Sequence, residues 1–184
     1  MNQPTAKKCK NDTNRVSQCD IFKDIVVIES FTTRGNQLTT REINFPFVIC
    51  LNQECDLVND YNEHNKEDGN HLKDSALLHL AIAPLFIIDQ FRAGEHWGEI
   101  FYSDRTNSEA IKKIKQNQTE RYHYINFPPD EKFPEMVIDF KHFFTISRDV
   151  LYSQISKRIC SLAPVYREKI SQRFSYYVSR IGLP

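Results

Sequence analysis

The segment Phe47-Val-Ile-Cys-Leu51 is the strongest structural signal in this sequence. It is apolar at every position and β-branched at its centre, which predicts a strand that is buried on both faces. Pro46 stands directly before it, and polar residues follow it from Asn52 onward. We therefore expect the strand to begin after the proline and to end at Leu51.

The residues on the N-terminal side of this strand predict a β-hairpin. Residues 21–28 contain a β-branched run, residues 38–43 return with a threonine-rich alternation, and Arg34-Gly-Asn36 is typical of the turn between them. Residues 1–17 are polar and show no periodicity, which predicts a flexible tail. Residues 18–184 are then expected to form a single globular domain.

The C-terminal two thirds of the chain predict a mixture of strands and helices. Expected strands are residues 75–84, 100–102, 121–127 and 136–146, and expected helices are residues 85–93, 107–117, 147–161 and 164–181. Within the strand at 136–146, Asp139 is expected to point away from the core. The last helix carries an apolar stripe formed by Ile170, Phe174, Tyr177, Val178 and Ile181. Strands with the helices placed late predict an α+β fold.

The charge of the chain is balanced overall but unevenly distributed. The 184 residues contain 24 Lys and Arg against 24 Asp and Glu, which argues against a uniformly basic nucleic-acid binder. Residues 54–74 hold seven acidic residues against two lysines, and we expect them to form an acidic loop. Residues 105–121 and 157–180 are basic. These segments indicate a dipolar molecule, and the alternative is that they are ordinary solvated faces.

Several features predict a cytoplasmic protein without a membrane partner. No apolar run approaches the length needed to span a bilayer, and the N-terminus lacks the apolar core of a secretory signal. The five cysteines are an odd number, and we expect them to be reduced thiols.

The polar residues after the first strand form a candidate site. Asn52 and Gln53 are candidate binding residues, and Cys55 and Asp56 are candidate catalytic residues. Cys55 could act as a nucleophile if a base such as His71 or His79 lay nearby. The alternative is that Cys55 is a small buried residue and that Asp56 caps the following turn.

Metal binding is only weakly indicated, and neither a metal nor a cofactor is expected. The six histidines show no zinc-ligand spacing, and His79 is expected to be a core residue. A hard-cation site is conceivable at Asp56, Asp60, Glu63 and Asp68, but these residues lack EF-hand spacing.

Basic and aromatic residues alternate in the second half of the chain, as they do in proteins that bind single-stranded nucleic acid. The candidate binding residues are Lys112, Lys113, Arg121, Tyr124, Arg173 and Arg180. The alternative is ordinary amphipathicity, in which the rings pack inward while the cations remain hydrated.

Four segments resemble a group of uncharacterised bacterial proteins. They are Cys19-Asp-Ile-Phe-Lys-Asp-Ile25, residues 45–57, residues 138–146, and residues 166–184, which end in Arg-Ile-Gly-Leu-Pro. The first half of the chain is also similar to the MazF/PemK-like toxins, which are ribonucleases with an SH3-like barrel. In that comparison Asp20-Ile21, residues 46–51 and residues 77–84 take the places of the barrel strands.

This second resemblance implies an SH3-like β-barrel core with helical additions and a C-terminal amphipathic helix. It also implies a barrel without the ribonuclease chemistry. The arginine before the proline is Phe45 here, and the hydroxyl at the end of the later strand is replaced by Ala83-Pro84. Electrostatic stabilisation is usually the largest catalytic contribution, so its loss argues against catalysis.

Three functional hypotheses follow, and the oligomeric state is left open. The first is a non-catalytic barrel that binds single-stranded nucleic acid or a protein partner, in a toxin or phage-defence context. The second is a hydrolase or nuclease with its site around residues 52–56. The third is a regulatory protein that docks through the acidic loop at residues 54–74.

Overall fold

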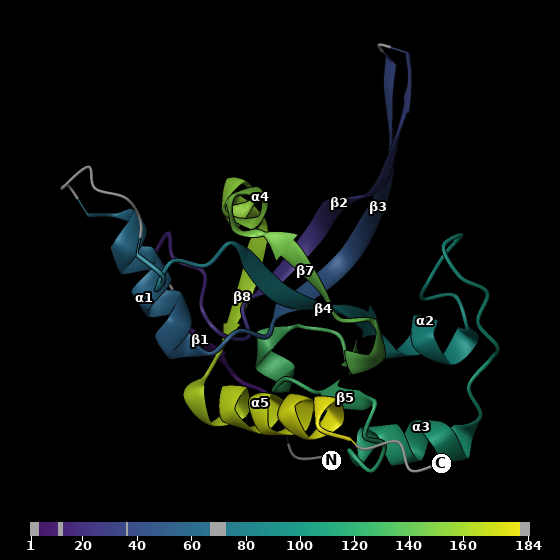
Figure 1. Cartoon of the computed structure of the whole chain (residues 1–184). Helices are drawn as coiled ribbons and strands as arrows, with labels where there is room; N and C mark the ends of the chain where they lie inside the picture. Colours follow the sequence, from purple (N-terminus) through teal and green to yellow (C-terminus); the bar gives the residue numbers. More distant parts are fainter. Residues whose placement is uncertain (1–3, 11–12, 36, 67–72, 181–184) are drawn as a thin grey trace.

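The computed structural model describes residues 4–10, 13–35, 37–66 and 73–180, and its strands form one curled antiparallel sheet (Figure 1). The strands are β1 (Lys8–Cys9), β2 (Ile21–Arg34), β3 (Gln37–Cys50), β4 (His79–Ile87), β5 (Tyr122–Ile125), β6 (Met136–Asp139), β7 (Phe144–Ser147) and β8 (Arg158–Leu162). Their order is β1-β8-β2-β3-β4-β6-β5, with β7 also paired to β4. The sheet forms a half-barrel, and the predicted α+β class is confirmed.

The helices lie around this half-barrel (Figure 1). They are α1 (Glu54–His64), α2 (Ile88–Ala93), α3 (Ser108–Lys115), α4 (Arg148–Ser153) and α5 (Pro164–Val178), with short 3-10 turns η1 (Pro129–Glu131), η2 (Phe140–His142) and η3 (Ile155–Lys157). Within the part of the chain that is described, no helix combines the length and apolar character needed to cross a membrane.

The predicted hairpin is confirmed, and β3 continues through Pro46 instead of starting after it. Pro46 lies opposite Asp24, between the register pairs Lys23–Phe47 and Ile25–Phe45. Asp24 has a φ of 53°, and its carbonyl oxygen accepts a hydrogen bond of 2.7 Å from the Lys157 ammonium. The missing N–H of the proline therefore leaves no carbonyl without a donor.

The strand β4 continues through Pro84 to Ile87, although the sequence predicted that the proline would stop it. On the side away from β3, β4 pairs with β7 at residues 79–82 and with β6 at residues 85–87. Pro84 lies in the gap between these two partners, where no ladder hydrogen bond is required. Helix α2 consequently begins at Ile88 and not at Leu85.

The expected strand at residues 136–146 is two strands, β6 and β7, separated by η2. The break arises because the two strands pair with different stretches of β4, so the chain must step across between them. Asp139 ends β6 and is completely buried, so the expectation that it points to solvent is wrong. Residues 100–102 form no strand.

Two further elements differ from the predictions. Residues 54–64 of the expected acidic loop form α1, whose buried residues are Leu57, Asp60 and Glu63. The expected helix at residues 147–161 is the short α4 followed by η3 and β8. Residues 67–72 of the acidic segment lie outside the described residues.

The described N-terminal residues, 4–10 and 13–17, are packed against the sheet, in contrast to the flexible tail expected for residues 1–17. Residues 1–3 and 11–12 lie outside the described residues. Strand β1 pairs with β8, and the Thr5 hydroxyl donates to the Tyr124 carbonyl oxygen at 3.1 Å. Ala6 and Val16 are completely buried. These contacts hold the described parts of this segment in place.

The two late helices begin where the sequence predicted. Asn107 caps α3, its side-chain oxygen accepting the backbone N–H of Ala110 at 2.9 Å. Pro164 lies in the first turn of α5. Ile170 is the buried residue of α5, whereas Val178, expected on the apolar stripe, is exposed.

Candidate functional site

The residues that follow β3 hold the end of that strand. The Asn52 side-chain oxygen accepts the backbone N–H of Ala81 in β4 at 2.7 Å. Gln53 is exposed and stands at the cap of α1 without a side-chain capping bond. Asn52 thus joins the end of β3 to β4, while Gln53 faces solvent.

The two candidate catalytic residues of this segment lie exposed on the first turn of α1. The Cys55 sulfur lies 3.7 Å from the Gln53 side-chain oxygen and 3.6 Å from an Asp56 carboxylate oxygen. Among the described residues, no hydrogen bond or ion pair joins Cys55 to a histidine. His79 is exposed at the start of β4, so the prediction of a core residue is wrong, and His71 lies outside the described residues.

Two of the acidic residues of the conceivable cation site, Asp60 and Glu63, pair with basic side chains. Arg148 donates to both carboxylate oxygens of Asp60, at 3.1 and 2.8 Å, and Lys66 pairs with Glu63. Asp68 is outside the described residues. Over residues 4–10, 13–35, 37–66 and 73–180, no three His, Cys, Asp or Glu side chains are grouped so that they could hold a metal ion.

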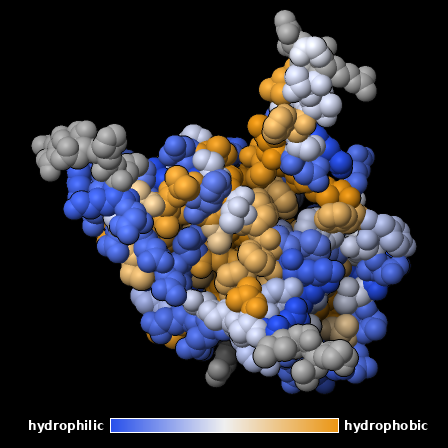
Figure 2. Space-filling model, viewed as in Figure 1, coloured by the Kyte–Doolittle hydropathy of each residue, from blue (hydrophilic) through white to orange (hydrophobic). Residues whose placement is uncertain are grey.

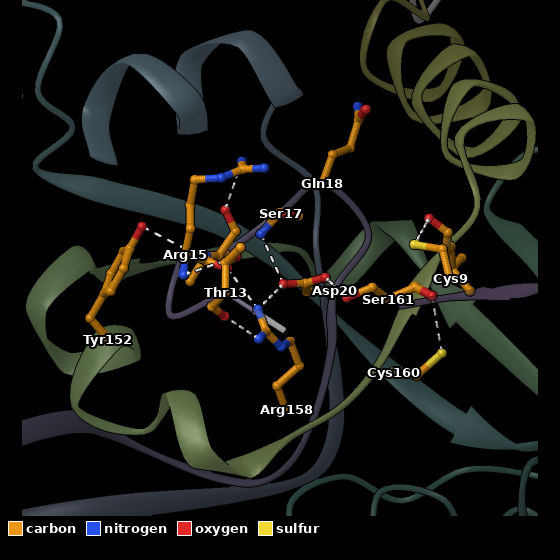
Figure 3. A network of polar contacts seen from close by, with 12 residues as sticks. Cys9, Thr13, Arg15, Ser17, Gln18, Asp20, Tyr152, Arg158, Cys160 and Ser161 are labelled. Atoms are coloured by element: carbon orange, nitrogen blue, oxygen red, sulfur yellow. Dashed lines mark hydrogen bonds and ion pairs between the residues drawn. The ribbon is translucent and has the colours of Figure 1, made fainter. Parts of the chain in front are cut away.

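A buried carboxylate next to this segment belongs to Asp20 (Figure 3). It accepts the backbone N–H of Ser17 at 2.8 Å, the hydroxyl of Ser161, and Nη1 of Arg158 at 3.1 Å. Burial raises the pKa of Asp20 above its ordinary value of 3.8, against the opposing effect of these three donors. The network ties β2 to β8.

The guanidinium of Arg158 also binds the N-terminal segment (Figure 3). Its two terminal nitrogens donate to the carbonyl oxygens of Arg15 at 2.6 Å and Thr13 at 2.5 Å. Arg15 in turn pairs with Glu54 at 2.7 Å, and Glu54 accepts the Gln18 backbone N–H at 2.8 Å. We interpret this network as structural, because each of these polar groups joins two segments of the chain.

The predicted nucleic-acid residues do not form one surface. Arg173 donates to the carbonyl oxygens of Asn117, Thr119 and Tyr122, each at 2.8 Å, and so fastens α5 to the loop before β5. Tyr124 is buried in the core, and Arg180 stacks on Tyr177.

Lys112 and Lys113 are exposed candidates on a helix apart from α5. Both are exposed on α3, and Lys113 pairs with Glu109 at 3.0 Å. Lys112 also borders a shallow hollow of about 410 Å³ together with Arg92 and Lys115.

The structure contains a hydrophobic pocket that is not among the predicted sites. It lies where the β2–β3 hairpin leaves the body and has a volume of about 430 Å³. We call it the hairpin-root pocket. Its apolar walls include Val27, Ile43, Phe45, Trp97, Phe101 and Phe144. Phe45 stacks on Phe144 with ring centroids 4.8 Å apart, which makes this wall rigid.

A polar triad, formed by Arg121, Asp139 and His142, stands at the edge of this pocket. Arg121 donates to both oxygens of the Asp139 carboxylate, Nε at 2.8 Å and Nη2 at 2.6 Å. His142 lines the pocket, and its Nδ1 lies 2.9 Å from Asp139 Oδ2. The predicted binding residue Arg121 therefore contributes to this site by fixing Asp139, which positions His142.

A second hollow of about 480 Å³ adjoins the hairpin-root pocket and shares Ile43, Phe45, Trp97 and Ile100 with it. His96 lines this hollow, and its ring lies 4.8 Å from Phe86. The Nδ1 atom of His96 is buried without a hydrogen-bond partner among the described residues. Burial lowers the pKa of His96, which favours the neutral ring.

Residues 94–101 carry Trp97 to both hollows, and Gly94 sets the direction of this loop. Gly94 ends α2 with a φ of 80°, and a Cβ atom placed on it would lie 2.5 Å from the Ser103 carbonyl oxygen. Trp97 packs edge-on against Phe86 at 4.9 Å and His142 at 4.7 Å. Only glycine meets both the conformational and the steric requirement at position 94.

We predict that Gly94→Ala lowers the free energy of unfolding by about 2 kcal/mol or more, because it adds a backbone clash to the strain of a positive φ. Gly98→Ala is the matched control, since Gly98 has a φ of 54° but open space around it. Its expected cost is about 1 kcal/mol. Urea denaturation of both variants measures the difference. An equal decrease in the free energy of unfolding would show that the clash with the Ser103 carbonyl does not contribute.

Neither a comparison with protein-family models nor one with curated proteins gives a match to this chain.

The sequence contained a weak signal for the hairpin-root pocket. Asp139 and His142 interrupt an otherwise apolar stretch, and polar residues at such a position need partners. Nothing in the sequence indicates that Trp97, more than forty residues earlier, would pack against this interruption.

Proposed function

We propose that this protein is a non-catalytic binding module that docks a partner protein in the hairpin-root pocket and along the projecting hairpin. The observation that carries the proposal is the apolar, aromatic lining of a pocket that opens beside an exposed apolar ribbon. Concave apolar pockets with a few polar groups at their edge are the usual form of a binding site.

The outer half of the hairpin has one apolar face. Residues paired across an antiparallel ladder share a face, and the pairs Ile28–Glu42, Phe31–Thr40 and Thr33–Leu38 place three large apolar residues on the same side. Ile28, Phe31 and Leu38 are 58%, 71% and 62% exposed. We call these three residues the hairpin row.

The hairpin row meets the hairpin-root pocket at Ile28. By the ladder register, the pocket residues Val27, Ile43 and Phe45 lie on the opposite face of the hairpin from the row. Ile28 belongs to the row and also lines the pocket. Figure 2 shows apolar residues along the hairpin continuing onto the body beneath it. Exposed apolar surface of this extent is typical of an interaction site.

The hairpin also offers free backbone edges. Strand β2 pairs with β8 only at Ile21 and Phe22, and β3 pairs with β4 only at residues 48–50. Among the described residues, the outer parts of both strands have no further strand beside them. An extended segment of a partner could add to such an edge while its side chains enter the pocket.

The charge around the neighbouring hollow favours a basic partner segment. Glu42, Glu95 and Glu99 line it, whereas the one arginine of its lining, Arg41, pairs with Glu29 at 3.0 Å. An apolar anchor flanked by Lys or Arg would match this arrangement.

The proposal includes the SH3-like, MazF/PemK-like identity of the barrel, in its non-catalytic form. The curled antiparallel sheet supports it. Phe45, which takes the place of the toxin arginine in that resemblance, is buried and stacked on Phe144. A core ring at this position supports binding without ribonuclease chemistry.

The test is selection of binding peptides from a random library, followed by affinity measurement with two variants. We predict that Phe31→Ser combined with Leu38→Ser weakens the selected peptides by about 30-fold or more, as expected for interface hot spots. Tyr176→Ser is the matched control, because Tyr176 is 60% exposed on α5, and it should change the affinity less than about twofold. Unchanged binding in the hairpin variant would overturn the proposal.

The same proteins distinguish the nucleic-acid hypothesis. Salt-dependent binding of single-stranded RNA that survives the hairpin substitutions but is lost in Lys112→Glu with Lys113→Glu would favour nucleic acid as the partner. Absence of RNA binding at low salt, together with hairpin-dependent peptide binding, would favour a protein partner.

A further inference from the structure

We propose that the hairpin-root pocket recognises an aromatic group that carries a hydrogen-bond donor, as a tyrosine side chain does, and that His142 Nε2 accepts this donor. The inference rests on the proposed function, because it names the anchor residue of the docked segment. It is drawn from the hydrogen bonds of His142, from the rings around it and from the size of the pocket.

The hydrogen bond to Asp139 decides which nitrogen of His142 is free. His142 Nδ1 lies 2.9 Å from Asp139 Oδ2 and 3.4 Å from Arg121 Nη2. Because the shorter contact is to a carboxylate, which only accepts hydrogen bonds, we assign the hydrogen to Nδ1. In the neutral ring Nε2 then keeps a lone pair and is an acceptor. No hydrogen bond or ion pair to His142 Nε2 is found among the described residues, so this acceptor is available to a ligand.

Asp139 is held firmly enough to fix this arrangement. Besides the two bonds from Arg121, its Oδ1 accepts the backbone N–H of Lys141 at 3.0 Å. The carboxylate is completely buried, and its charge is balanced by the guanidinium. The Arg121–Asp139 ion pair therefore holds the His142 ring in one orientation at the pocket, as expected for a preorganised acceptor.

The rings beside His142 favour an aromatic guest. Trp97 meets the imidazole at 72° with centroids 4.7 Å apart, and Phe101 lies 5.6 Å from it at 30°. A further ring inserted here could make both edge and face contacts, which aromatic pairs prefer. Phe101 is half exposed, so part of this aromatic surface is open to a ligand.

The volume of about 430 Å³ lies at the lower end of the range for ligand pockets, which is roughly 300–1,000 Å³. It suits one aromatic side chain with its neighbouring backbone better than a large cofactor. The apolar walls would reject a charged anchor, whereas a phenol brings a ring for the walls and one donor for His142.

The experiment uses small probes of the anchor and the full chain. Trp97 is the one tryptophan in the sequence and lines the pocket, so its fluorescence reports occupancy directly. Excitation at the red edge of its band avoids absorption by phenols. The probes are p-cresol, which has the tyrosine ring and donor, toluene, which lacks the donor, and 4-methylanisole, in which the donor is methylated.

The measured quantity is the ratio of the p-cresol affinity to the toluene affinity, because this ratio cancels most of the apolar contribution. We expect the ratio to fall about 5- to 10-fold in His142→Phe, which keeps a ring but loses the acceptor. His142→Gln, which retains an acceptor, should restore part of it. In the unaltered protein, 4-methylanisole should lose the same advantage, and this arm needs no variant to fold.

The outcomes separate the inference from the proposed function. If both probes bind but the ratio is independent of His142, the hydrogen bond is overturned while the pocket remains a docking site. If neither probe changes Trp97 fluorescence but selected peptides still depend on Phe31 and Leu38, the anchor is overturned and the hairpin surface stands. A His142-dependent ratio without any selected peptide would support a small-molecule site and overturn the protein partner.

Discussion

Arg158→Ala is expected to lower the free energy of unfolding by about 3–5 kcal/mol, because it leaves the Asp20 carboxylate buried without its cationic partner. It also removes the donors that bind the Arg15 and Thr13 carbonyl oxygens and hold the N-terminal segment. Chemical denaturation monitored by circular dichroism measures the loss. Arg180→Ala is the matched control, since its exposed guanidinium makes an expected difference below about 0.5 kcal/mol.

The Arg158 effect should also depend on pH. Arg158 is one of the groups that oppose the burial-raised pKa of Asp20, so its removal raises that pKa further. A carboxyl whose pKa is higher when folded binds its proton more tightly in the folded state, and folding weakens as pH rises through that pKa. The loss caused by Arg158→Ala should therefore be largest near neutral pH and shrink as the pH is lowered. A loss that is the same at every pH would show that Asp20 is not the group responsible.

His123 is expected to make the protein sensitive to acid. It is 4% exposed, and burial, reinforced by the positive charges of Arg173 and Lys169, lowers its pKa from 6.5 to about 3. A base whose pKa is depressed by folding must lose its proton to stay buried, so stability is lost as pH falls below about 6.5. Protonation linked to His123 alone should lower the free energy of unfolding by about 3 kcal/mol between pH 7 and pH 4.

His123→Leu tests this directly, because the Nδ1 atom of His123 has no hydrogen-bond partner among the described residues and leucine leaves nothing unpaired. We expect the variant to be at least as stable at pH 7 and to lose about 3 kcal/mol less on acidification. His79→Gln, at an exposed histidine, should keep the acid sensitivity of the unaltered protein. An unchanged slope in His123→Leu would assign the acid sensitivity to other groups.

The segments that could be predicted from the sequence are those in which the local residue preferences agree with the observed helix or strand. The β-branched runs of the hairpin, the Asn107 cap and Pro164 at the start of α5 are such cases. Helix α1 could not be recognised, because its inner face includes Asp60 and Glu63 and so lacks the apolar period of an amphipathic helix. Those carboxylates are tolerated inside because Arg148 and Lys66 pair with them.

The candidate sites show the same division. The position of Cys55 and Asp56 after a buried strand predicts a site, whereas the structure places both residues on an exposed helix surface. The charge of Arg121 indicates a binding residue, and in the structure Arg121 pairs with Asp139 on the neighbouring strand β6 instead of remaining free. A charged residue in the sequence shows that a partner is needed, whereas the fold decides whether that partner is solvent, a ligand or another side chain.

The sequence by itself determined the α+β class, the hairpin, and the starts of α3 and α5, because these follow from the preferences of neighbouring residues. Only the tertiary structure decided that Pro46 and Pro84 lie inside strands. Lys157 supplies the donor that Pro46 lacks, and Pro84 lies in the gap between β7 and β6, where the ladder has no bond to make. It also decided the hairpin-root pocket, since Trp97, His142 and Phe45 are brought together by strand pairing over long separations. Such pairing depends on the packing of the whole core, and no short stretch of the chain encodes it.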